Sequence, residues 1–335
     1  MKKLDQLLAF LAYSRRIMLQ LVNLTTAKHF YLIFRGFTPN KGLFYDFKKY
    51  GYKSYVNCFD RYLKTIYINY NFRSLFRDKY ISYIFLRQYT DKTVPVYALV
   101  DNGKCYFLDP HDTLESICQK EKKFVIKPRL GYAGKGVLVL EVADGKYFLN
   151  GVETPEKDLF KGVDSHVLVP YVYQHQYAAA IYPKTLNTIR LLTCILNEEI
   201  HFIAGGHRFG SSTTGYVDNF AQGGISCRID IPTGTLEDPT SLDRKTYRKK
   251  NVEYHPDTNQ KITGTAIPFW DAIIEDIKKL HLTINFVKYV GWDIAITEDG
   301  YRIIEANDVS DVDGLQMHGP FLINEQSKKF YEEYT

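Results

Sequence analysis

The chain has 335 residues, of which 45% are hydrophobic and 24% are charged, and its formal net charge is +5. These values are typical of a globular protein and exclude a collagen-like, disulfide-dense or long disordered chain. Residues 1–90 contain sixteen Lys or Arg against four Asp and no Glu, whereas the later residues contain twenty-seven Lys or Arg against thirty-four acidic residues. We therefore expect a basic N-terminal region on an otherwise acidic protein.

The five cysteines lie far apart without a Cys-x-x-Cys pair, which is typical of free thiols in a reducing cytoplasm. The apolar residues 7–13 precede Arg15 and Arg16 and lack a small-residue cleavage site, so they do not resemble a signal peptide. No stretch approaches the ~18 uncharged apolar residues that span a bilayer. We expect a cytoplasmic protein, and leave open a peripheral position at the inner face of the membrane.

The basic N-terminal region has the pattern of amphipathic helices. Leucines recur at helical spacing over residues 4–24, and residues 62–86 combine aromatic side chains with Arg73, Arg77 and Lys79. One interpretation is a helical domain whose Lys and Arg stems cover apolar surface while their charges stay in water. The other is docking of residues 1–90 onto an anionic partner, either an acidic glycan or lipid phosphate. No nucleic-acid partner is expected, because no nucleic-acid-binding signature is present.

Short β-rich segments follow from residue 94. Residues 96–100 and 105–108 flank an Asn-Gly turn, which predicts a hairpin. The remaining elements that we predict are strands at residues 123–127, 136–141, 167–172, 189–196 and 201–205, a helix at residues 270–287, and a hairpin of residues 291–297 with 301–307. Because no regular βαβ alternation appears, the pattern favours the α+β class.

A glycine-rich loop follows the strand that ends at Lys127. Such a loop lets the backbone approach a phosphate and direct its N–H groups toward it. The lysine in the loop is not followed by Ser or Thr, so it is not a P-loop, and a strand rather than a helix follows, so it is not a Rossmann loop. An ordinary flexible hairpin tip is the alternative. The loop residues in question are Gly131, Tyr132, Ala133, Gly134, Lys135 and Gly136.

The C-terminal hairpin brings acidic residues together. A three-residue loop would place Thr297 opposite Tyr301. Counting back four residues on each strand then places Asp293 opposite Glu305, and Asn307 shares the face of Glu305 because strand side chains alternate. Directly opposed carboxylates repel each other and call for a counter-cation.

Two carboxylates and an amide are hard oxygen ligands that suit Mg²⁺ beside nucleotide phosphates. The alternative is that one carboxylate faces solvent or pairs with Arg190, Arg208 or Arg302. We favour the metal interpretation, because the neighbouring Trp and Ile residues indicate a buried hairpin.

Two further segments lie between the glycine loop and the acidic hairpin. The apolar strand at residues 167–172 is an ordinary core strand or one that closes over a planar base. Arg190 and Arg208 follow, and arginines near a phosphate site bind a γ-phosphate or a substrate carboxylate bidentately. Either arginine alone would more often form a surface ion pair.

With these residues in hand, the chain resembles the ATP-grasp superfamily, and most closely its sugar-transfer-associated branch. The resemblance covers residues 123–318. The motifs that carry it occur in the expected order: Lys127 with residues 131–136, the strand at 167–172, Asn187 to Arg190, Asp218-Asn219 with Gly223-Gly224, Asp293, and Glu305-Ala306-Asn307.

The resemblance implies a role for each of these residues. Lys127 would contact the α-phosphate and the base edge of ATP, and the glycine loop would fold over the β- and γ-phosphates. The adenine pocket would be lined by Val169, Pro170, Tyr171 and Val172. One or two Mg²⁺ ions would be held by Asp293, Glu305 and Asn307.

The resemblance also implies catalytic and further nucleotide-binding residues. Arg190 and Arg208 would stabilise the transferred phosphoryl group and the acyl phosphate, and Asn219 belongs to the same catalytic set. Family members commonly have another nucleotide-contacting lysine earlier in the chain, and Lys92 and Lys104 are both candidates for it.

The resemblance implies an ATP-grasp fold, with a basic helical region at 1–92, a small subdomain at 93–170 and a large subdomain at 171–335. It further implies an ATP- and Mg²⁺-dependent carboxylate–amine ligase that acts through an acyl phosphate. The expected substrates are a uronic acid of a bacterial surface polysaccharide, or of its precursor, and an amino acid or amine. The alternatives are a kinase of a sugar hydroxyl and a non-catalytic nucleotide- or glycan-binding scaffold.

Overall fold

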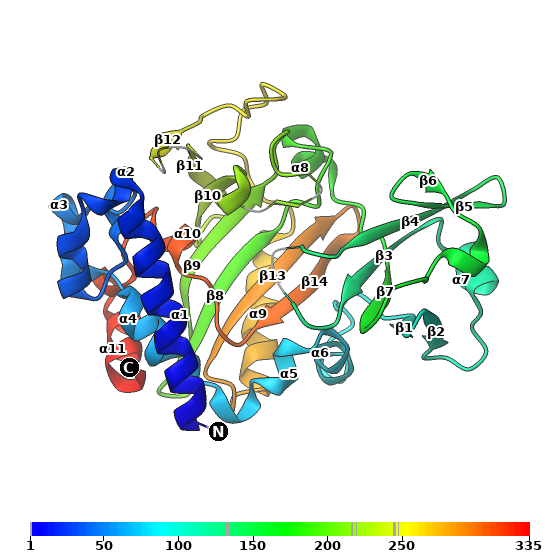
Figure 1. The fold of residues 1–335 in the computed structure, drawn as a ribbon, viewed down its shortest axis with the longest axis horizontal. Coiled ribbons are helices and arrows are strands. Elements are labelled where there is room, and N and C mark those ends of the chain that lie inside the picture. The colour runs from blue at the N-terminus through cyan, green and yellow to red at the C-terminus, as the bar shows by residue number, and fades with distance from the viewer. Residues whose placement is uncertain (1, 132–133, 216, 219, 244–245, 247) are drawn as a thin grey trace.

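A computed structural model describes residues 2–131, 134–215, 217–218, 220–243, 246 and 248–335. It contains an N-terminal helical region and two seven-stranded sheets whose neighbouring strands pair antiparallel (Figure 1). The predicted α+β class and the helical N-terminal region are thereby confirmed. The division at residues 92 and 170 stays a prediction, although each sheet draws its strands from one side of residue 170. All five cysteines are free thiols.

The N-terminal region consists of short helices after one long one. Its elements are α1 (Lys2–Val22), α2 (Leu24–Ala27), α3 (Phe47–Tyr50), α4 (Cys58–Leu63), α5 (Ser74–Arg77) and α6 (Lys79–Leu86), with the 3-10 helices η1 (Phe30–Arg35), η2 (Pro39–Leu43), η3 (Tyr52–Ser54), η4 (Thr65–Tyr67) and η5 (Tyr70–Phe72). Aromatic residues form its small core, in which the rings of Tyr45 and Tyr55 stack with centroids 4.5 Å apart. Asp78 caps α6 by accepting hydrogen bonds from the N–H groups of Tyr80 and Ile81.

The small sheet has the strand order β2-β1-β7-β3-β4-β5-β6. Its strands are β1 (Ala98–Asp101), β2 (Lys104–Phe107), β3 (Lys123–Pro128), β4 (Leu138–Ala143), β5 (Lys146–Leu149), β6 (Val152–Glu153) and β7 (His166–Pro170), and α7 (Leu114–Lys120) packs against it. The predicted first hairpin is confirmed: Asn102 and Gly103 both have positive φ, as a tight two-residue turn requires. The predicted strands on either side of the glycine loop are β3 and β4.

The large sheet has the strand order β12-β11-β10-β9-β8-β13-β14. Its strands are β8 (Ile189–Leu196), β9 (Glu199–Phe209), β10 (Ile225–Asp230), β11 (Thr235–Leu242), β12 (Lys249–Asn251), β13 (Tyr289–Thr297) and β14 (Gly300–Asn307). Helix α8 (Gln176–Ile181) precedes it in the chain, and the elements that follow it are α10 (Asp313–Gln316), η8 (Phe321–Ile323) and α11 (Glu325–Tyr334).

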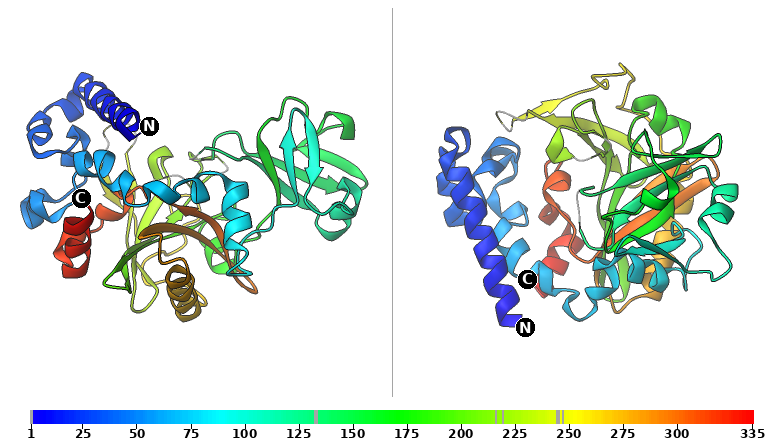
Figure 2. Two further views of the ribbon diagram at one scale, coloured as in Figure 1. Left: turned by 90° about the horizontal axis from the view of Figure 1, so that it is seen from below. Right: turned by 45° about the vertical axis from the view of Figure 1, so that its right-hand side comes forward.

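Helices cover both faces of the large sheet (Figure 2). Leu191 packs in the same cluster as residues of α9 (Trp270–Thr283), whereas the next residue, Leu192, packs with Phe330 of α11. Successive strand side chains point to opposite faces, so α9 and α11 lie on opposite sides. The two central strands β8 and β13 are thus covered on both faces, and they carry Arg190 and Asp293 of the candidate site.

The hairpin of β13 and β14 closes differently from our prediction. Thr297 pairs with Gly300, so the predicted pairing of Thr297 with Tyr301 is wrong. Gly300 has a φ of +137°, a conformation that glycine adopts readily and that closes the turn one residue earlier. A β-bulge beside Asp293 adds one residue on β14 and restores the predicted opposition of Asp293 and Glu305.

Candidate active site

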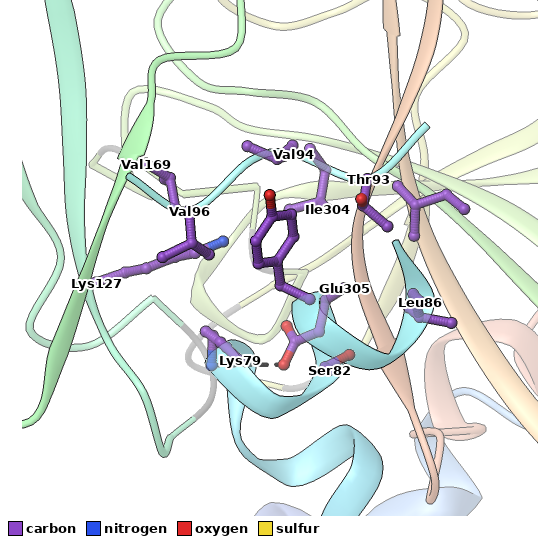
Figure 3. Close-up of a pocket in the computed structure, with 12 residues that line it drawn as sticks. Lys79, Ser82, Leu86, Thr93, Val94, Val96, Lys127, Val169, Ile304 and Glu305 are labelled. Carbon is purple, nitrogen blue, oxygen red and sulfur yellow. Dashed lines mark ion pairs between the residues drawn. The ribbon is translucent and has the colours of Figure 1, made fainter. Parts of the chain in front are cut away.

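A pocket lies where the small sheet, the large sheet and α6 meet (Figure 3). Its cavity is about 30 Å³, which holds roughly two water molecules. A larger ligand therefore requires the walls to separate or their side chains to move. The lining residues are Lys79, Ser82, Tyr83, Leu86, Thr93, Val94, Val96, Lys127, Val169, Ile303, Ile304 and Glu305.

The structure brings three predicted site residues into this pocket: Lys127 from β3, Val169 from β7 and Glu305 from β14. Lys127 is partly buried, and this burial lowers the pKa of its ammonium group to about 8, against the opposing effect of the Glu305 carboxylate. Lys79 lowers that pKa further, because it places a second positive charge nearby. The pocket is therefore a site where cations converge beside an apolar wall.

Helix α6 contributes a lysine that sequence reasoning did not assign to the site. The ammonium nitrogen of Lys79 lies 3.5 Å from a Glu305 carboxylate oxygen and donates a 3.0 Å hydrogen bond to the Gly131 carbonyl. The backbone N–H of Lys79 also donates to the carbonyl of Arg129, whose guanidinium pairs with Asp78 at 2.5 Å. Helix α6 thus joins the start of the glycine loop to β14.

Neither of the two lysines considered from the sequence lines this pocket. The ammonium nitrogen of Lys92 is 3.8 Å from Asp91, and Lys104 is exposed on β2. Lys79 belongs to the basic pattern of the N-terminal region, and the sequence signal available for it was the Asp78 cap that fixes where α6 begins. Its approach to Glu305 depends on packing between segments more than 200 residues apart.

A row of charged residues crosses three strands next to the pocket. Asp293 on β13 faces Arg190 on β8 on one side and Glu305 on β14 on the other. Arg190 donates to both carboxylate oxygens of Asp293, with its terminal nitrogen at 2.8 Å, and Arg208 lies 3.2 Å from the same carboxylate. Asp293 is 7% exposed. Burial alone would raise the pKa of Asp293, but the two guanidinium groups hold it below its usual value.

A second layer of hydrogen bonds orients Arg208. Its terminal nitrogen donates a 2.5 Å hydrogen bond to the Thr188 hydroxyl, and Asp218 accepts a 2.9 Å hydrogen bond from the Thr188 backbone N–H. Burial raises the pKa of Asp218, although Arg208 at 3.5 Å acts in the opposite direction. Thr188 and Asp218 both lie in motifs that the resemblance singled out, and they fix the direction of the arginine rather than line the pocket.

The residues predicted to bind Mg²⁺ occupy one edge of this row. Glu305 and Asn307 are alternate residues of β14, and the Asn307 amide nitrogen donates to the Gly291 carbonyl at 3.2 Å. Their carboxylate and amide oxygens have the chemistry that Mg²⁺ prefers. Both oxygens of Asp293 accept from Arg190, so the alternative of an arginine-paired carboxylate describes Asp293 in this structure.

No group of three or more His, Cys, Asp or Glu side chains suited to a metal is found among the residues that the structure describes. A metal at this edge would therefore depend on the Asn307 amide and on substrate oxygens as well as carboxylates. The donor set Glu305 and Asn307 fits that arrangement, and the assignment of Asp293, Glu305 and Asn307 as ligands stays a prediction.

The glycine loop reaches toward the large sheet. Gly134 has a φ of +68°, and a Cβ atom there would collide with a methyl group of Val217. The Gly136 carbonyl lies 3.3 Å from the Nε2 atom of His166, and Lys135 is exposed. Gly134 thus packs closely against the segment that precedes β10, which leaves no room for a side chain at this position.

Six predicted residues lie elsewhere or outside the described part of the chain. The three that follow Val169 do not line the pocket, and the Tyr171 ring instead lies 4.7 Å from the ammonium nitrogen of Lys123. Those three are Pro170, Tyr171 and Val172. Tyr132, Ala133 and Asn219 fall outside the described residues.

The N-terminal region also contacts the segment at residues 308–313, directly after β14. Burial would raise the pKa of Asp313, but the charges of Lys41 and Arg61 lower it to about 2. The ammonium nitrogen of Lys41 lies 2.5 Å from a carboxylate oxygen of Asp313, and the lysine side chain is only 3% exposed. Three ion pairs join the two segments: Arg77 to Asp308 at 3.3 Å, Arg61 to Asp311 at 3.3 Å, and Lys41 to Asp313.

A chain of Ser226, His318 and Asp238 has the residue types of a serine hydrolase triad. The Ser226 hydroxyl is 3.0 Å from one ring nitrogen of His318, and Asp238 is 2.8 Å from the other. Ser226 is the second residue of β10, is 3% exposed and does not line the pocket. We therefore assign this chain of hydrogen bonds to the structure that supports β10 and β11.

A family model described as sugar-transfer associated ATP-grasp matches residues 58–329. The match begins 65 residues before the part on which we based the resemblance, and it includes α6 with Lys79. No curated protein sequence matches the chain.

Several solved structures are similar over most of this chain. D-Alanine-D-alanine ligase from Helicobacter pylori is 12% identical with a TM-score of 0.41, covering 78% of this chain and 59% of its own. D-Alanyl-alanine synthetase A from Vibrio cholerae is 13% identical with a TM-score of 0.45, covering 78% and 66%. N5-Carboxyaminoimidazole synthetase from Staphylococcus aureus, complexed with ADP, is 13% identical with a TM-score of 0.40, covering 71% and 46%.

This chain thus spans between 46% and 66% of the length of these three proteins. The family match, in contrast, covers most of the chain and contains both sheets, α6 and the charged row. The protein belongs to the sugar-transfer associated ATP-grasp family.

Proposed function

We propose that the protein is an ATP- and Mg²⁺-dependent carboxylate–amine ligase that works through an acyl phosphate. The observation that carries this proposal is that Arg190 and Arg208 converge on Asp293, which faces Glu305, while Lys79 and Lys127 lie next to Glu305 in the pocket. Four cations around one short strand segment provide the charge that a nucleotide triphosphate and an anionic acceptor require. The ADP complex of the Staphylococcus aureus synthetase supports a nucleotide as the ligand.

In the first step, an acceptor carboxylate oxygen attacks the γ-phosphorus of ATP. The bond between that phosphorus and the β–γ bridging oxygen breaks, and ADP leaves. Lys127 and Lys79 hold the nucleotide phosphates, and Arg190 and Arg208 neutralise charge on the transferred group and orient the carboxylate. Mg²⁺ held by Glu305 and Asn307 would supply further neutralisation of the phosphate oxygens when bound.

In the second step, the amine nitrogen attacks the acyl carbon. The carbon–oxygen bond to the phosphoryl group breaks, inorganic phosphate leaves and the nitrogen loses a proton. No side-chain nucleophile is required by this sequence. Binding and orientation of the carboxylate by guanidinium groups is the contribution of this chain.

The proposed acceptor is a uronic acid of a surface polysaccharide or its precursor, and the proposed amine is an amino acid or simple amine. The family description supports a sugar, and the two arginines support a carboxylate on that sugar. A sugar kinase on the same scaffold would instead transfer the phosphoryl group to a hydroxyl, without an acyl phosphate.

The test is an ADP-release screen of uronic acids against amino acids, followed by mass spectrometry of the products. Hydroxylamine separates the alternatives, because it converts an acyl phosphate to a hydroxamate and does not react with a phosphosugar. We expect a hydroxamate with uronic acid and ATP. A phosphosugar would instead establish the kinase, and no ADP release with any acceptor would favour a non-catalytic scaffold.

Variants locate the chemistry within the chain. Glu305→Gln should lower ADP formation by about a hundredfold or more, since it removes a charge from the site. Asp299→Asn is the matched control, because Asp299 lies at the tip of the same hairpin and its side chain is 69% exposed. Equal activity of the two variants would remove Glu305 from the active site.

A further inference from the structure

Helix α1 presents its apolar side outward. Seven of its apolar residues, at helical spacing, have 52–85% of their surface exposed: Leu4, Leu7, Leu8, Leu11, Met18, Leu19 and Val22. Its other side faces the N-terminal region, where Tyr13 is buried and Ile17 packs in the same cluster. Helices on globular proteins normally bury their apolar stripe, so α1 is reversed relative to that rule.

Polar contacts hold α1 in this orientation. Asp5 accepts a 2.9 Å hydrogen bond from the Tyr70 hydroxyl and lies 2.9 Å from the guanidinium of Arg73. Gln20 accepts a 2.9 Å hydrogen bond from the backbone N–H of Asn40. Through these contacts the polar residues of α1 face the protein, and its leucines face away from it.

Four further exposed apolar residues follow α1 in the chain. Leu24 is 89% exposed and Phe34 is 86% exposed, and Phe30 and Tyr31 of η1 are exposed between them. We name the seven residues of α1 and these four the N-terminal apolar face. Both views of Figure 2 show α1 along an outer edge of the molecule, away from the small sheet. A row of exposed apolar residues along one side of a helix, as on α1, is typical of an interaction site.

The charges around the N-terminal apolar face are positive. Residues 1–35 contain six Lys or Arg and one acidic residue, Asp5, which is paired with Arg73. Arg15, Lys28 and Arg35 are exposed. The surface therefore combines aliphatic and aromatic side chains with cations and offers no free carboxylate to repel an anionic partner.

We propose that the N-terminal apolar face binds the surface of an anionic lipid bilayer. The leucines and aromatic residues would enter the boundary between headgroups and acyl chains, and the cations would contact lipid phosphates. No helix in the described part of the chain is both long and apolar enough to span a bilayer. The helix would thus lie in the plane of the membrane.

Two other occupants fit this surface less well. A second copy would bring Arg15 of each chain into one interface, where the one acidic residue of residues 1–35, Asp5, is already paired with Arg73. An acidic glycan would match the cations but would leave the leucines without an apolar partner, since sugars bind mainly through hydrogen bonds and ring stacking. The bilayer satisfies both features at once.

The experiment is co-sedimentation of the full-length protein with vesicles of phosphatidylcholine and phosphatidylglycerol, and with vesicles of phosphatidylcholine alone. We expect binding to the anionic vesicles that weakens at high salt. A variant with Leu8→Gln, Leu11→Gln and Met18→Gln should bind at least about tenfold more weakly. These side chains are exposed, so the substitutions remove no core packing.

A matched control carries Val152→Gln and Ile323→Gln, which are 66% and 63% exposed outside this face. It should bind vesicles like the unchanged protein. Absence of binding to anionic vesicles would overturn the proposal. It would equally be overturned if the triple variant abolished self-association in analytical ultracentrifugation, or if soluble acidic polysaccharide bound as tightly as the vesicles and competed with them. The readout is independent of ligase activity, so it stands or fails separately from the proposed function.

Discussion

Residues 1–35 and residues 36–90 are both basic, but their cations face different surroundings. In the first stretch Arg15, Lys28 and Arg35 are exposed beside the N-terminal apolar face. In the second, four cations reach acidic residues of β14 and the segment after it: Lys41, Arg61, Arg77 and Lys79. Net charge therefore does not distinguish a docking surface from the wall of an active site. The two are distinguished by the groups that each cation contacts.

Part of the second stretch, from residue 58 onward, lies within the family match. The family match begins at residue 58, so it includes α6 and excludes α1. The ion pairs to residues 308–313 anchor the helical region next to the charged row formed by Arg190, Asp293 and Glu305. We infer that the inward-facing cations support folding and nucleotide binding, whereas the outward-facing ones act on an external surface.

The largest effect on this contrast is expected when Lys41 is replaced and the stability of the protein is measured. Lys41→Met removes the partner of Asp313 and leaves a largely buried carboxylate with fewer compensating charges. We therefore expect the free energy of unfolding to fall by about 3 kcal/mol. Urea denaturation measures this. Lys48→Met on α3, an exposed lysine of the same stretch, is the control and should be near neutral.

The pH dependence of the Lys41 pair follows from the direction of the Asp313 shift. Its folded-state pKa is about 2, below the ordinary 3.8. The stabilisation is therefore present above pH ~4 and is lost as the pH falls toward 2. If Lys41→Met were as stable as Lys48→Met at neutral pH, the inward cations would not differ energetically from surface ones.

The next effect concerns nucleotide binding by Lys79. Lys79→Met removes a cation between Glu305 and the Gly131 carbonyl, and charged hydrogen bonds contribute about 2 kcal/mol, so ADP affinity should fall roughly thirtyfold. Isothermal titration calorimetry measures this. Lys92→Met is the control, because Lys92 lies outside the pocket. A larger loss in Lys92→Met than in Lys79→Met would contradict the assignment.

The sequence was sufficient for nine of the fourteen strands that the structure describes and for the opposed pair, the latter partly through compensation. The five strands that we did not predict are β5, β6, β10, β11 and β12. Asp293 does face Glu305, yet the predicted three-residue loop is wrong and a β-bulge corrects the register. A bulge reflects how β13 packs between β8 and β14 and has no local pattern that we could recognise. The strands themselves follow from alternating and apolar segments that local sequence encodes well.

Long-range charge pairing could not be predicted in the same way. Arg190 and Asp293 are 103 residues apart, and Lys79 and Glu305 are further apart still. From the sequence alone, pairing of either arginine with a carboxylate is only the alternative interpretation, and Lys79 is one of many cations in a basic helical region. Which of many possible ion pairs forms depends on the packing of α6 against two sheets, which local periodicity does not contain.

A smaller effect would show whether Lys79 acts on Lys127 through its charge. Because the pKa of Lys127 is lowered to about 8, its ammonium loses a proton as the pH rises through that value. Phosphate binding favours the charged form, so ADP affinity should fall above pH ~8, by up to tenfold per pH unit. Removing the nearby positive charge should raise the pKa of Lys127 again.

The relative pH profile of Lys79→Met should accordingly shift to higher pH by less than about one unit. Calorimetric titrations from pH 6 to about pH 9.5 would resolve this, after each series is scaled to its value at the lowest pH. Lys127→Met should abolish the decline. An unshifted profile in Lys79→Met would mean that Lys79 binds phosphate without influencing its neighbour.

The smallest effect belongs to the outward-facing stretch. Arg15→Gln removes a cation beside the N-terminal apolar face and removes no ion pair described for the protein. The free energy of unfolding should therefore change by less than about 0.5 kcal/mol. Binding to anionic vesicles should weaken about fivefold, since one cation near a charged bilayer contributes roughly 1 kcal/mol. ADP affinity should be unchanged, because α1 does not line the pocket. Comparing Arg15→Gln with Lys41→Met and Lys79→Met then distinguishes the two stretches by the free energy of unfolding, vesicle binding and ADP affinity. If Arg15→Gln lowered stability or ADP affinity as much as the inward variants do, the basic region would act as one unit and the contrast between its two stretches would be wrong.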